Sequence, residues 1–367
     1  AWRKKGELHL FHDRIVQGMV QRGYPVDFAQ GIFAQIEGFG EYGFPESHAY
    51  SFALLSYVSA WMKCHEPEAF LAALLNSQPM GFYGPAQLVQ DARRHGVAVR
   101  PVAVQHSHWD CTLEPPLESP EARPAVRLGL RLVSGLQEGV AQALVRARTQ
   151  APFADVQDLA QRAGLSAADL QRLARADALQ ALAGHRRQQL WQASGVQRPT
   201  RRAAVMADLF EHNPAPEAAA PELPDAPEGQ AITLDYASTG LSLRRHPLAL
   251  MRPRLQQRGW HSAHALQQWP DGRRAWACGL VTMRQQPVTA KGTTFITLED
   301  ETGCVNVIVW RHIREQQRLV VLQARLLAVV GQWQNRNGVQ HLVARRLLDV
   351  SPWLGELGRV TASRDFR

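Results

Sequence analysis

The sequence contains few of the residues and runs that point to secretion, membrane insertion or metal binding. Its four cysteines, Cys64, Cys111, Cys278 and Cys304, lie far apart, and none forms a Cys-x-x-Cys pair. This spacing indicates neither a disulfide framework nor a zinc site and favours the reducing cytoplasm. There is no signal peptide, and the longest apolar run, residues 52–62, is shorter than the ~20 residues that span a bilayer. We therefore expect no contact with a membrane.

Histidine patterns give no metal site either. The only close pair is His106-x-His108, which has no partner set of histidine and carboxylate, so we interpret it as a loop feature. We assign no metal ligand and no catalytic residue to this chain.

The composition favours a globular, basic protein of several domains. The 367 residues are 45% hydrophobic, and 41 Lys and Arg against 33 Asp and Glu give a net charge of +8. A chain of this length exceeds one compact core, so we expect two to four domains. Most of the basic residues are arginine, which favours a phosphate polymer as partner, although such charge also serves solubility.

The N-terminal part has the apolar spacing of helices. Residues 8–37 predict two helices separated by Gly23-Tyr24-Pro25, and residues 49–64 predict a mainly buried helix. Further helices are expected from Glu66-Pro67-Glu68 onward and over 87–94, followed by a strand over 97–104.

A glycine-rich loop precedes the third of these helices. It runs Phe-Gly-Glu-Tyr-Gly-Phe-Pro-Glu-Ser-His from residue 39 to 48, with Ser47 as a candidate N-cap. Glycine permits close approach of the backbone to a ligand, and Pro45 fixes φ. The loop could present Tyr42, Phe44 and His48 to a planar or phosphorylated ligand, or it could tuck its rings into the core.

Residues 125–200 predict a second helical unit. The run Gly135-Leu136-Gln137-Glu138-Gly139 before a helix is similar to a helix-hairpin-helix turn, whose backbone N–H groups, here around Gly135 and Gly139, bind a DNA phosphate. An ordinary bundle with glycine C-caps is the alternative. The second half, residues 153–182, shows helical periodicity without an obvious glycine hairpin.

A linker and a β-rich domain complete the chain. Residues 211–230 hold five prolines, five acids and no Lys or Arg, a composition that buries too little to fold alone. Five β-rich runs follow, at 275–282, 293–298, 304–310, 325–333 and 340–347, with a helical insert at 312–319. This pattern is typical of an OB-fold.

The β-rich region carries much of the positive charge. Residues 271–367 contain 14 Lys and Arg against 8 Asp and Glu, which leaves +6. We expect a groove that binds single-stranded DNA through cationic side chains and two rings, Phe295 and Trp333, that stack on bases. The cationic residues of this prediction are Arg284, Lys291, Arg311, Arg336 and Arg345. In the alternative interpretation the rings fill the barrel and the arginines are merely solvated.

The loop at 39–48 and its continuation carry a family resemblance. Together with Ser56-Tyr57-Val58-Ser59-Ala60-Trp61-Met62-Lys63-Cys64-His65, residues 74–83 and residues 91–96, the loop resembles the fingers of C-family (DnaE-type) bacterial DNA polymerases. Phe-Pro-Glu-Ser-His is similar to the error-prone ImuC branch, where replicative enzymes have Phe-Asn-Lys-Ser-His. The resemblance covers nearly the whole chain.

The resemblance implies roles for particular residues. It assigns Tyr42, Phe44, Ser47 and His48 to the incoming dNTP, with His48 against the sugar, and it places Arg3, Lys4 and Lys5 near DNA, unless they are an exposed basic end. It also implies Mg²⁺ held by palm carboxylates with an Asp-x-Asp signature. Because no Asp-x-Asp occurs here, we interpret the chain as a C-terminal fragment that extends no primer alone.

The implied partners are DNA, dNTP and accessory proteins of the ImuA and ImuB type. The segment 206–210, Met-Ala-Asp-Leu-Phe, resembles the sliding-clamp motif Gln-x-Asp-Leu-Phe, but Met206 replaces the glutamine. This loss of the polar anchor argues against a direct clamp contact.

The predicted fold is multidomain: a mainly α N-terminal part and a C-terminal all-β OB-fold. We expect a partial fingers region at 1–120, a helix-hairpin-helix region at 121–205, a linker and connecting segment at 206–270, the OB-fold at 271–355 and a tail at 356–367. A non-catalytic DNA-binding adaptor and a replicative polymerase III alpha subunit are the competing interpretations.

Overall fold

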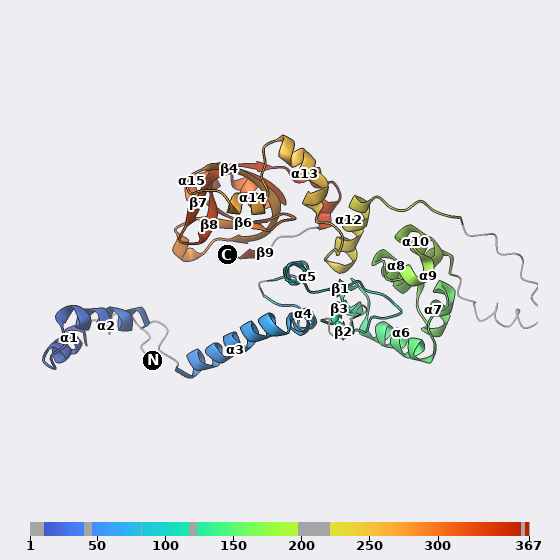
Figure 1. The fold of residues 1–367 in the computed structure, drawn as a ribbon, viewed down its shortest axis with the longest axis horizontal. Coiled ribbons are helices and arrows are strands. Elements are labelled where there is room, and N and C mark those ends of the chain that lie inside the picture. The colour runs from blue at the N-terminus through green and yellow to red at the C-terminus, as the bar shows by residue number, and fades with distance from the viewer. Residues whose placement is uncertain are drawn as a thin grey trace, which may run out of the picture. The chain divides into compact units, whose positions relative to one another are not determined.

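The computed structural model describes residues 11–39, 46–81, 83–116, 123–196, 221–360 and 364–366. The chain divides into two compact units, residues 1–66 and residues 67–367, and each is described by itself. Figure 1 labels their helices and strands.

The described residues of the first unit form three helices, α1 (His12–Val20), α2 (Val26–Phe39) and α3 (Glu46–His65). The predicted break between the first two is confirmed, with Gly23 at a φ of 88°. Val16, Ala29 and Phe33 form a small core between α1 and α2. Edge-to-face packing of His12 on Phe33, with ring centroids 4.6 Å apart, extends this core.

Helix α3 differs from the prediction of a mainly buried helix. Its large apolar side chains are exposed in this structure, among them Tyr50, Leu55, Tyr57 and Trp61. The prediction was wrong because these residues are distributed around the helix and no described element packs over them. Apolar content alone does not supply a packing partner.

The second unit begins with two helices and a small sheet. Helices α4 (Pro67–Asn76) and α5 (Pro85–Arg94) confirm the predicted helical segments. The sheet has the order β1-β3-β2, from β1 (Val99–Arg100), β2 (Thr112–Glu114) and β3 (Ala125–Arg127). The predicted strand over 97–104 is confined to two residues, because Pro101 has no amide hydrogen to continue the ladder.

A partly buried cluster of charges braces this sheet. The Glu114 carboxylate accepts hydrogen bonds from Arg127 at 2.7 and 3.0 Å and from Arg100 at 2.6 Å. Burial acts to raise the pKa of Glu114, but these hydrogen bonds outweigh it, and the pKa lies below its ordinary value.

Six short helical elements follow and form the helical region proper. They are η2 (Leu130–Leu132), α6 (Glu138–Gln150), α7 (Val156–Arg162), α8 (Ala167–Arg175), α9 (Gln180–Ala183) and α10 (Arg186–Gly195). Leucines at helical spacing form their core, and Leu144, Leu159, Leu170 and Leu173 are fully buried. This spacing is the one that predicted helices here.

Three helices lie in the described part, residues 221–270, of the segment that the sequence assigns to a linker and connecting region. They are α12 (Glu228–Thr239), α13 (Pro247–Gln257) and α14 (Ala263–Gln267). Two ion-pair clusters fix them. Arg186 of α10 pairs with Asp235 of α12, and Arg252 of α13 pairs with Asp300 and Glu301 of the barrel.

The C-terminal part of the second unit is a five-stranded barrel. Its strands are β4 (Arg274–Gln285), β5 (Thr294–Glu299), β6 (Cys304–Val309), β7 (Leu326–Arg336) and β8 (Val339–Asp349), which confirms all five predicted strands. The sheet runs β5-β6-β8-β7-β4, and an additional β4–β5 pairing closes the ring. The strand β9 (Arg364–Phe366) pairs with β4.

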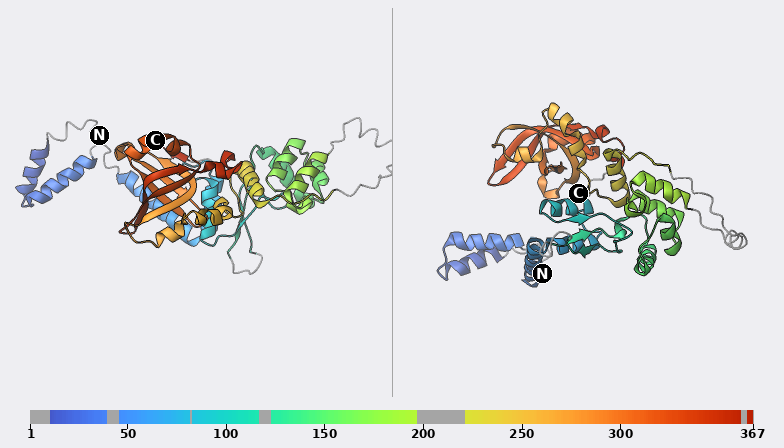
Figure 2. Two further views of the ribbon diagram at one scale, coloured as in Figure 1. Left: turned by 90° about the horizontal axis from the view of Figure 1, so that it is seen from above. Right: turned by 45° about the vertical axis from the view of Figure 1, so that its right-hand side comes forward.

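Two short helices, α15 (Arg311–Gln316) and α16 (Arg318–Gln323), occupy the predicted insert between β6 and β7. The remaining elements are η3 (Val288–Ala290), η4 (Ser351–Leu354) and α17 (Leu357–Val360). Figure 2 shows the barrel strands from two further sides. The arrangement is consistent with the predicted OB-fold.

A search of the described residues for a helix that is both long and apolar enough to cross a membrane finds none.

Candidate nucleic-acid interface

The outer face of β5 and β6 carries exposed apolar side chains. Side chains alternate along β5, so that Ile296 and Leu298 are buried while Phe295 is 38% exposed. Phe295 lies opposite Ile308 of β6 in the ladder. In OB-folds the second and third strands, which β5 and β6 are here, form the face that binds oligonucleotides.

A groove of about 730 Å³ lies on this face and brings together three of the predicted site residues. Lys291, Phe295 and Arg311 all line it, and Trp310, 47% exposed, adds a second ring. Two rings and two cations in one groove are what a sequence-tolerant single-strand site requires, because bases stack on rings and phosphates pair with cations.

Local backbone geometry positions the two cations. Lys291 and Gly292 have φ values of 48° and 86°, so the chain turns sharply just before β5. A Cβ at Gly292 would lie 3.2 Å from Cδ of Arg311, so the glycine leaves room for the arginine stem. The Arg311 guanidinium pairs with Glu315 at 2.8 Å and remains largely exposed.

Trp310 was missed by the sequence analysis. Its position in the sequence could have identified it. Trp310 directly follows the alternating strand β6 and precedes a helix, so it lies at the end of the outer face.

Two predicted DNA-binding residues of the barrel are corrected by the structure. Trp333 is 1% exposed and fills the barrel interior, because β7 directs its odd-numbered residues inward. It cannot stack on a base. Arg284 is 6% exposed, and its guanidinium donates to the carbonyl oxygens of Val321 and Ala324 in and after α16. It therefore caps a helix end and is not available to a phosphate.

Arg336 and Arg345 lie outside the groove. Arg336, 73% exposed, pairs with Asp271 at 3.1 Å beside the tight turn between β7 and β8. Arg345 lies in β8 and is exposed. An assignment of either to DNA stays a prediction.

The hairpin before α6 exposes backbone groups. Gly135 has a φ of 77°, and the neighbouring Leu136 is buried, which anchors the turn. Helix α6 begins at Glu138 without a side-chain cap, and a Cβ added at Gly139 would meet nothing within 4 Å. The first turn of α6 thus presents uncapped N–H groups on an open surface, although Glu138 brings an acid close to them.

The second half of this region also contains a glycine turn, which the sequence analysis overlooked. Gly164, with a φ of 64°, separates α7 from α8. Helix α8, however, has its own capping box, in which the Ser166 side chain and Asp169 satisfy each other's backbone amides. Its N-terminus is therefore less available to an outside anion than that of α6.

The predicted nucleotide-binding residues belong to the first unit. His48 is exposed in the first turn of α3 and packs against Phe52, with ring centroids 4.4 Å apart. The helix already begins at Glu46, so Ser47 lies inside it and is not its N-cap. Tyr42 and Phe44, Arg3, Lys4 and Lys5, and the clamp-like segment 206–210 lie outside the described residues.

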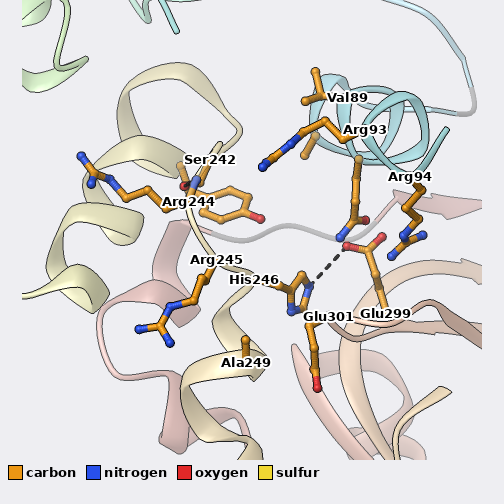
Figure 3. Close-up of a pocket in the computed structure, with 13 residues that line it drawn as sticks. Val89, Arg93, Arg94, Ser242, Arg244, Arg245, His246, Ala249, Glu299 and Glu301 are labelled. Atoms are coloured by element: carbon orange, nitrogen blue, oxygen red, sulfur yellow. Dashed lines mark hydrogen bonds and ion pairs between the residues drawn. The ribbon is translucent and has the colours of Figure 1, made fainter. Parts of the chain in front are cut away.

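A second cavity, of about 400 Å³, lies between α5, the turn before α13 and the barrel (Figure 3). His246 Nε2 lies 3.5 Å from Glu299 Oε1, and the Gln90 amide, when oriented with its nitrogen toward Glu299, donates to the same carboxylate. Arg244 and Arg245 point away from the centre and form ion pairs elsewhere. Most of the charged side chains around this cavity pair with other residues of the second unit. We therefore interpret the cavity as a gap in the packing between elements of that unit.

The described part of the chain brings together no three His, Cys, Asp or Glu side chains that could hold a metal ion.

Comparison with protein families agrees with the hairpin geometry. Residues 96–189 match the family model described as a helix-hairpin-helix motif. This match supports the predicted helix-hairpin-helix region.

The whole chain is similar to part of larger enzymes. It is 55% identical over 369 aligned residues to the error-prone DNA polymerase of Bordetella parapertussis, covering 100% of this chain and 34% of that protein. The error-prone DNA polymerases of Methylococcus capsulatus and of Azoarcus are 53% and 55% identical, with 36% and 34% of their lengths covered. The chain thus spans about a third of the length of the curated relatives that it matches.

Among solved structures, asparaginyl-tRNA synthetase from Pyrococcus horikoshii matches 22% of this chain and 20% of its own, at 18% identity and a TM-score of 0.20. This similarity is too low to support an argument.

Proposed function

We propose that this chain is the C-terminal part of an error-prone DNA-directed DNA polymerase of the C family, ImuC branch, acting in translesion synthesis. The observation that carries the proposal is identity above 50%, over the full chain, to proteins named error-prone DNA polymerase. The catalytic Mg²⁺ and its carboxylates then belong to a part of the enzyme outside these residues, and the enzyme works in the cytoplasm.

The barrel, as an OB-fold, holds single-stranded template in this proposal. Phe295 and Trp310 offer faces for stacking, while Lys291 and Arg311 neutralise phosphates at the same groove. Stacking accepts every base, which suits an enzyme that must pass altered template.

The hairpin before α6 holds the sugar–phosphate backbone. The open first turn of α6, with Gly139 exposed, and the preceding turn at Gly135, which lies beside the Arg172 side chain, offer N–H donors that read no base. Residues 42–48 form the wall of the dNTP pocket in the fingers. Accessory proteins of the ImuA and ImuB type act with the intact enzyme.

Binding of a fluorescein-labelled single-stranded oligonucleotide, followed by anisotropy, tests the proposed groove. Phe295→Ala and Trp310→Ala should each weaken binding by roughly 1–3 kcal/mol if each ring stacks one base. Lys291→Ala and Arg311→Ala should each lower the slope of log affinity against log salt by about 1.

Trp333→Phe is the matched control, because this ring is in the same domain but buried. It should leave DNA affinity unchanged. Equal losses for Trp310→Ala and Trp333→Phe would indicate damage to the barrel and would contradict the groove assignment.

A non-catalytic DNA-binding adaptor is the competing function, favoured by the separate hairpin and barrel surfaces. Primer extension by the full-length gene product separates the two. Extension that fails in the full-length protein, with DNA binding intact, would favour the adaptor. Replacing Pro45-Glu46 with Asn-Lys in the intact enzyme tests the error-prone branch, since unchanged fidelity and dNTP affinity would remove that argument.

A further inference from the structure

A second groove, apolar and distinct from the DNA-binding face, lies between α12, α13 and the turn formed by η4 and α17. It has a volume of about 410 Å³ and is lined mainly by Ile232, Leu250, Met251, Trp353 and Leu357. Leu250 is 37% exposed, whereas Ile232 and Leu357 belong to a buried cluster that continues into the barrel. The groove thus has a fixed floor and an open apolar edge.

Two cations stand over Trp353 of this groove. The guanidinium carbons of Arg254 and Arg258 lie 3.7 and 4.7 Å from its ring centroid. Both side chains belong to exposed residues, and no carboxylate of the described residues pairs with either. Two like charges four positions apart repel each other, which their place at the C-terminal end of α13 only partly offsets.

The contrast with Arg252 on the same helix is informative. Arg252 is mostly buried and pairs with both Asp300 and Glu301. Arg254 and Arg258 are held in place by the ring, with their charge left unneutralised. A carboxylate from outside could satisfy both of them.

Trp353 itself has little face left for a base. Besides the two guanidinium groups, it stacks on Trp260, with centroids 5.4 Å apart and an interplanar angle of 24°. The groove beside it is lined by aliphatic side chains. These surroundings favour a peptide over a nucleic acid as the occupant.

We propose that this groove binds a short segment of a partner protein that combines Leu, Ile or Phe side chains with at least one Asp or Glu. The apolar side chains fill the space beside Leu250 and Met251, and the carboxylate pairs with Arg254 and Arg258. Glu356 also lines the groove, and its negative charge repels the carboxylate of the peptide. The peptide is therefore oriented with its own carboxylate toward the arginines. A surface of this size suits a weak, transient contact.

Selection of a phage-displayed library of random decapeptides on the immobilised chain tests the proposal. Enriched peptides should combine acidic and large aliphatic or aromatic residues, and a synthetic copy of the most enriched peptide should bind in solution. Failure to enrich any such class, or enrichment of peptides without acids, overturns it.

Variants locate the site. Leu250→Glu and the double change Arg254→Gln with Arg258→Gln should each weaken the selected peptide at least tenfold, while Arg311→Ala, in the DNA groove, should leave it unchanged. The oligonucleotide should show the reverse pattern. If the double change weakens the oligonucleotide more than the peptide, the site belongs to nucleic acid and the proposal is wrong.

Circular dichroism melting of each variant guards against misfolding. If Leu250→Glu unfolds the chain, the test rests on the double arginine change alone, because it alters only exposed residues. Its effect on binding of the selected peptide then supports or overturns the proposal.

Discussion

Gly139 in the helical region and Gly331 in the barrel are both glycines, but they differ in how much space a side chain would have. A Cβ at Gly139 would meet nothing within 4 Å, whereas a Cβ at Gly331 would lie 2.1 Å from the carbonyl oxygen of Val343. The barrel needs its glycine because β7 and β8 approach closely at a bulge. The hairpin does not need its glycine for packing, which leaves that position open for a ligand.

In the proposed function the two regions also differ in the groups that they offer to DNA. The hairpin presents main-chain N–H groups, whose position depends on backbone conformation. The barrel presents aromatic rings and cationic side chains on the outer face of β5 and β6. Substitutions in the hairpin should therefore act by changing the backbone conformation. Substitutions on the barrel face should act by removing the rings or the charges themselves.

The largest effect is expected at Gly331→Ala. The added methyl group would overlap the main chain of β8, and we expect a loss of about 4 kcal/mol or more in the free energy of unfolding. Urea unfolding followed by tryptophan fluorescence measures it. A loss below about 1 kcal/mol would mean that the strands can separate at the bulge, and the contrast between the two glycines would disappear.

Glu114→Gln should have the next largest effect, and it tests how the small sheet β1-β3-β2 is braced. Removing the charge that Arg100 and Arg127 share should cost about 2 kcal/mol at neutral pH.

The pH dependence of this loss has a defined sign. Because the folded-state pKa of Glu114 lies below its ordinary value of 4.5, its stabilisation is present above that value and disappears as pH falls through the folded-state pKa. Parallel unfolding curves of the parent and Glu114→Gln chains should converge below about pH 4.5. A constant gap across this range would show that Glu114 acts by packing alone.

Gly139→Ala should have the smallest effect on stability, and one of opposite sign. Alanine in the first turn of α6 should stabilise the chain by about 0.5–1 kcal/mol, since no neighbour obstructs the methyl group. The same methyl group should hinder a phosphate at the N–H groups, so duplex affinity should fall in anisotropy measurements. Unchanged affinity would remove Gly139 from the proposed interface.

Local signals predicted the elements of this fold well. Alternation located all five barrel strands, and Gly23-Tyr24-Pro25 located the break between α1 and α2, because both depend on neighbours in the chain. Of the predicted groove residues, Lys291, Phe295 and Arg311 meet in one place.

The errors share a physical cause. Whether Trp333 faces in or out depends on the register of β7 in a closed barrel, and whether Arg284 is free depends on where α16 ends. Exposure of α3 depends on what packs against it. These are properties of long-range contacts, which a single sequence does not display.

Closure of the barrel has one more consequence. Since β4 pairs with both β5 and β7, the five strands close into a ring, and β5 does not end the sheet as a free edge that another chain could extend. On β5 the inward residues Ile296 and Leu298 belong to the barrel core, whereas Phe295 lies on the exposed face, so the two sets can change separately over generations. Substitutions of single exposed side chains on this face can thus change its ligand preference during evolution with little effect on the stability of the domain.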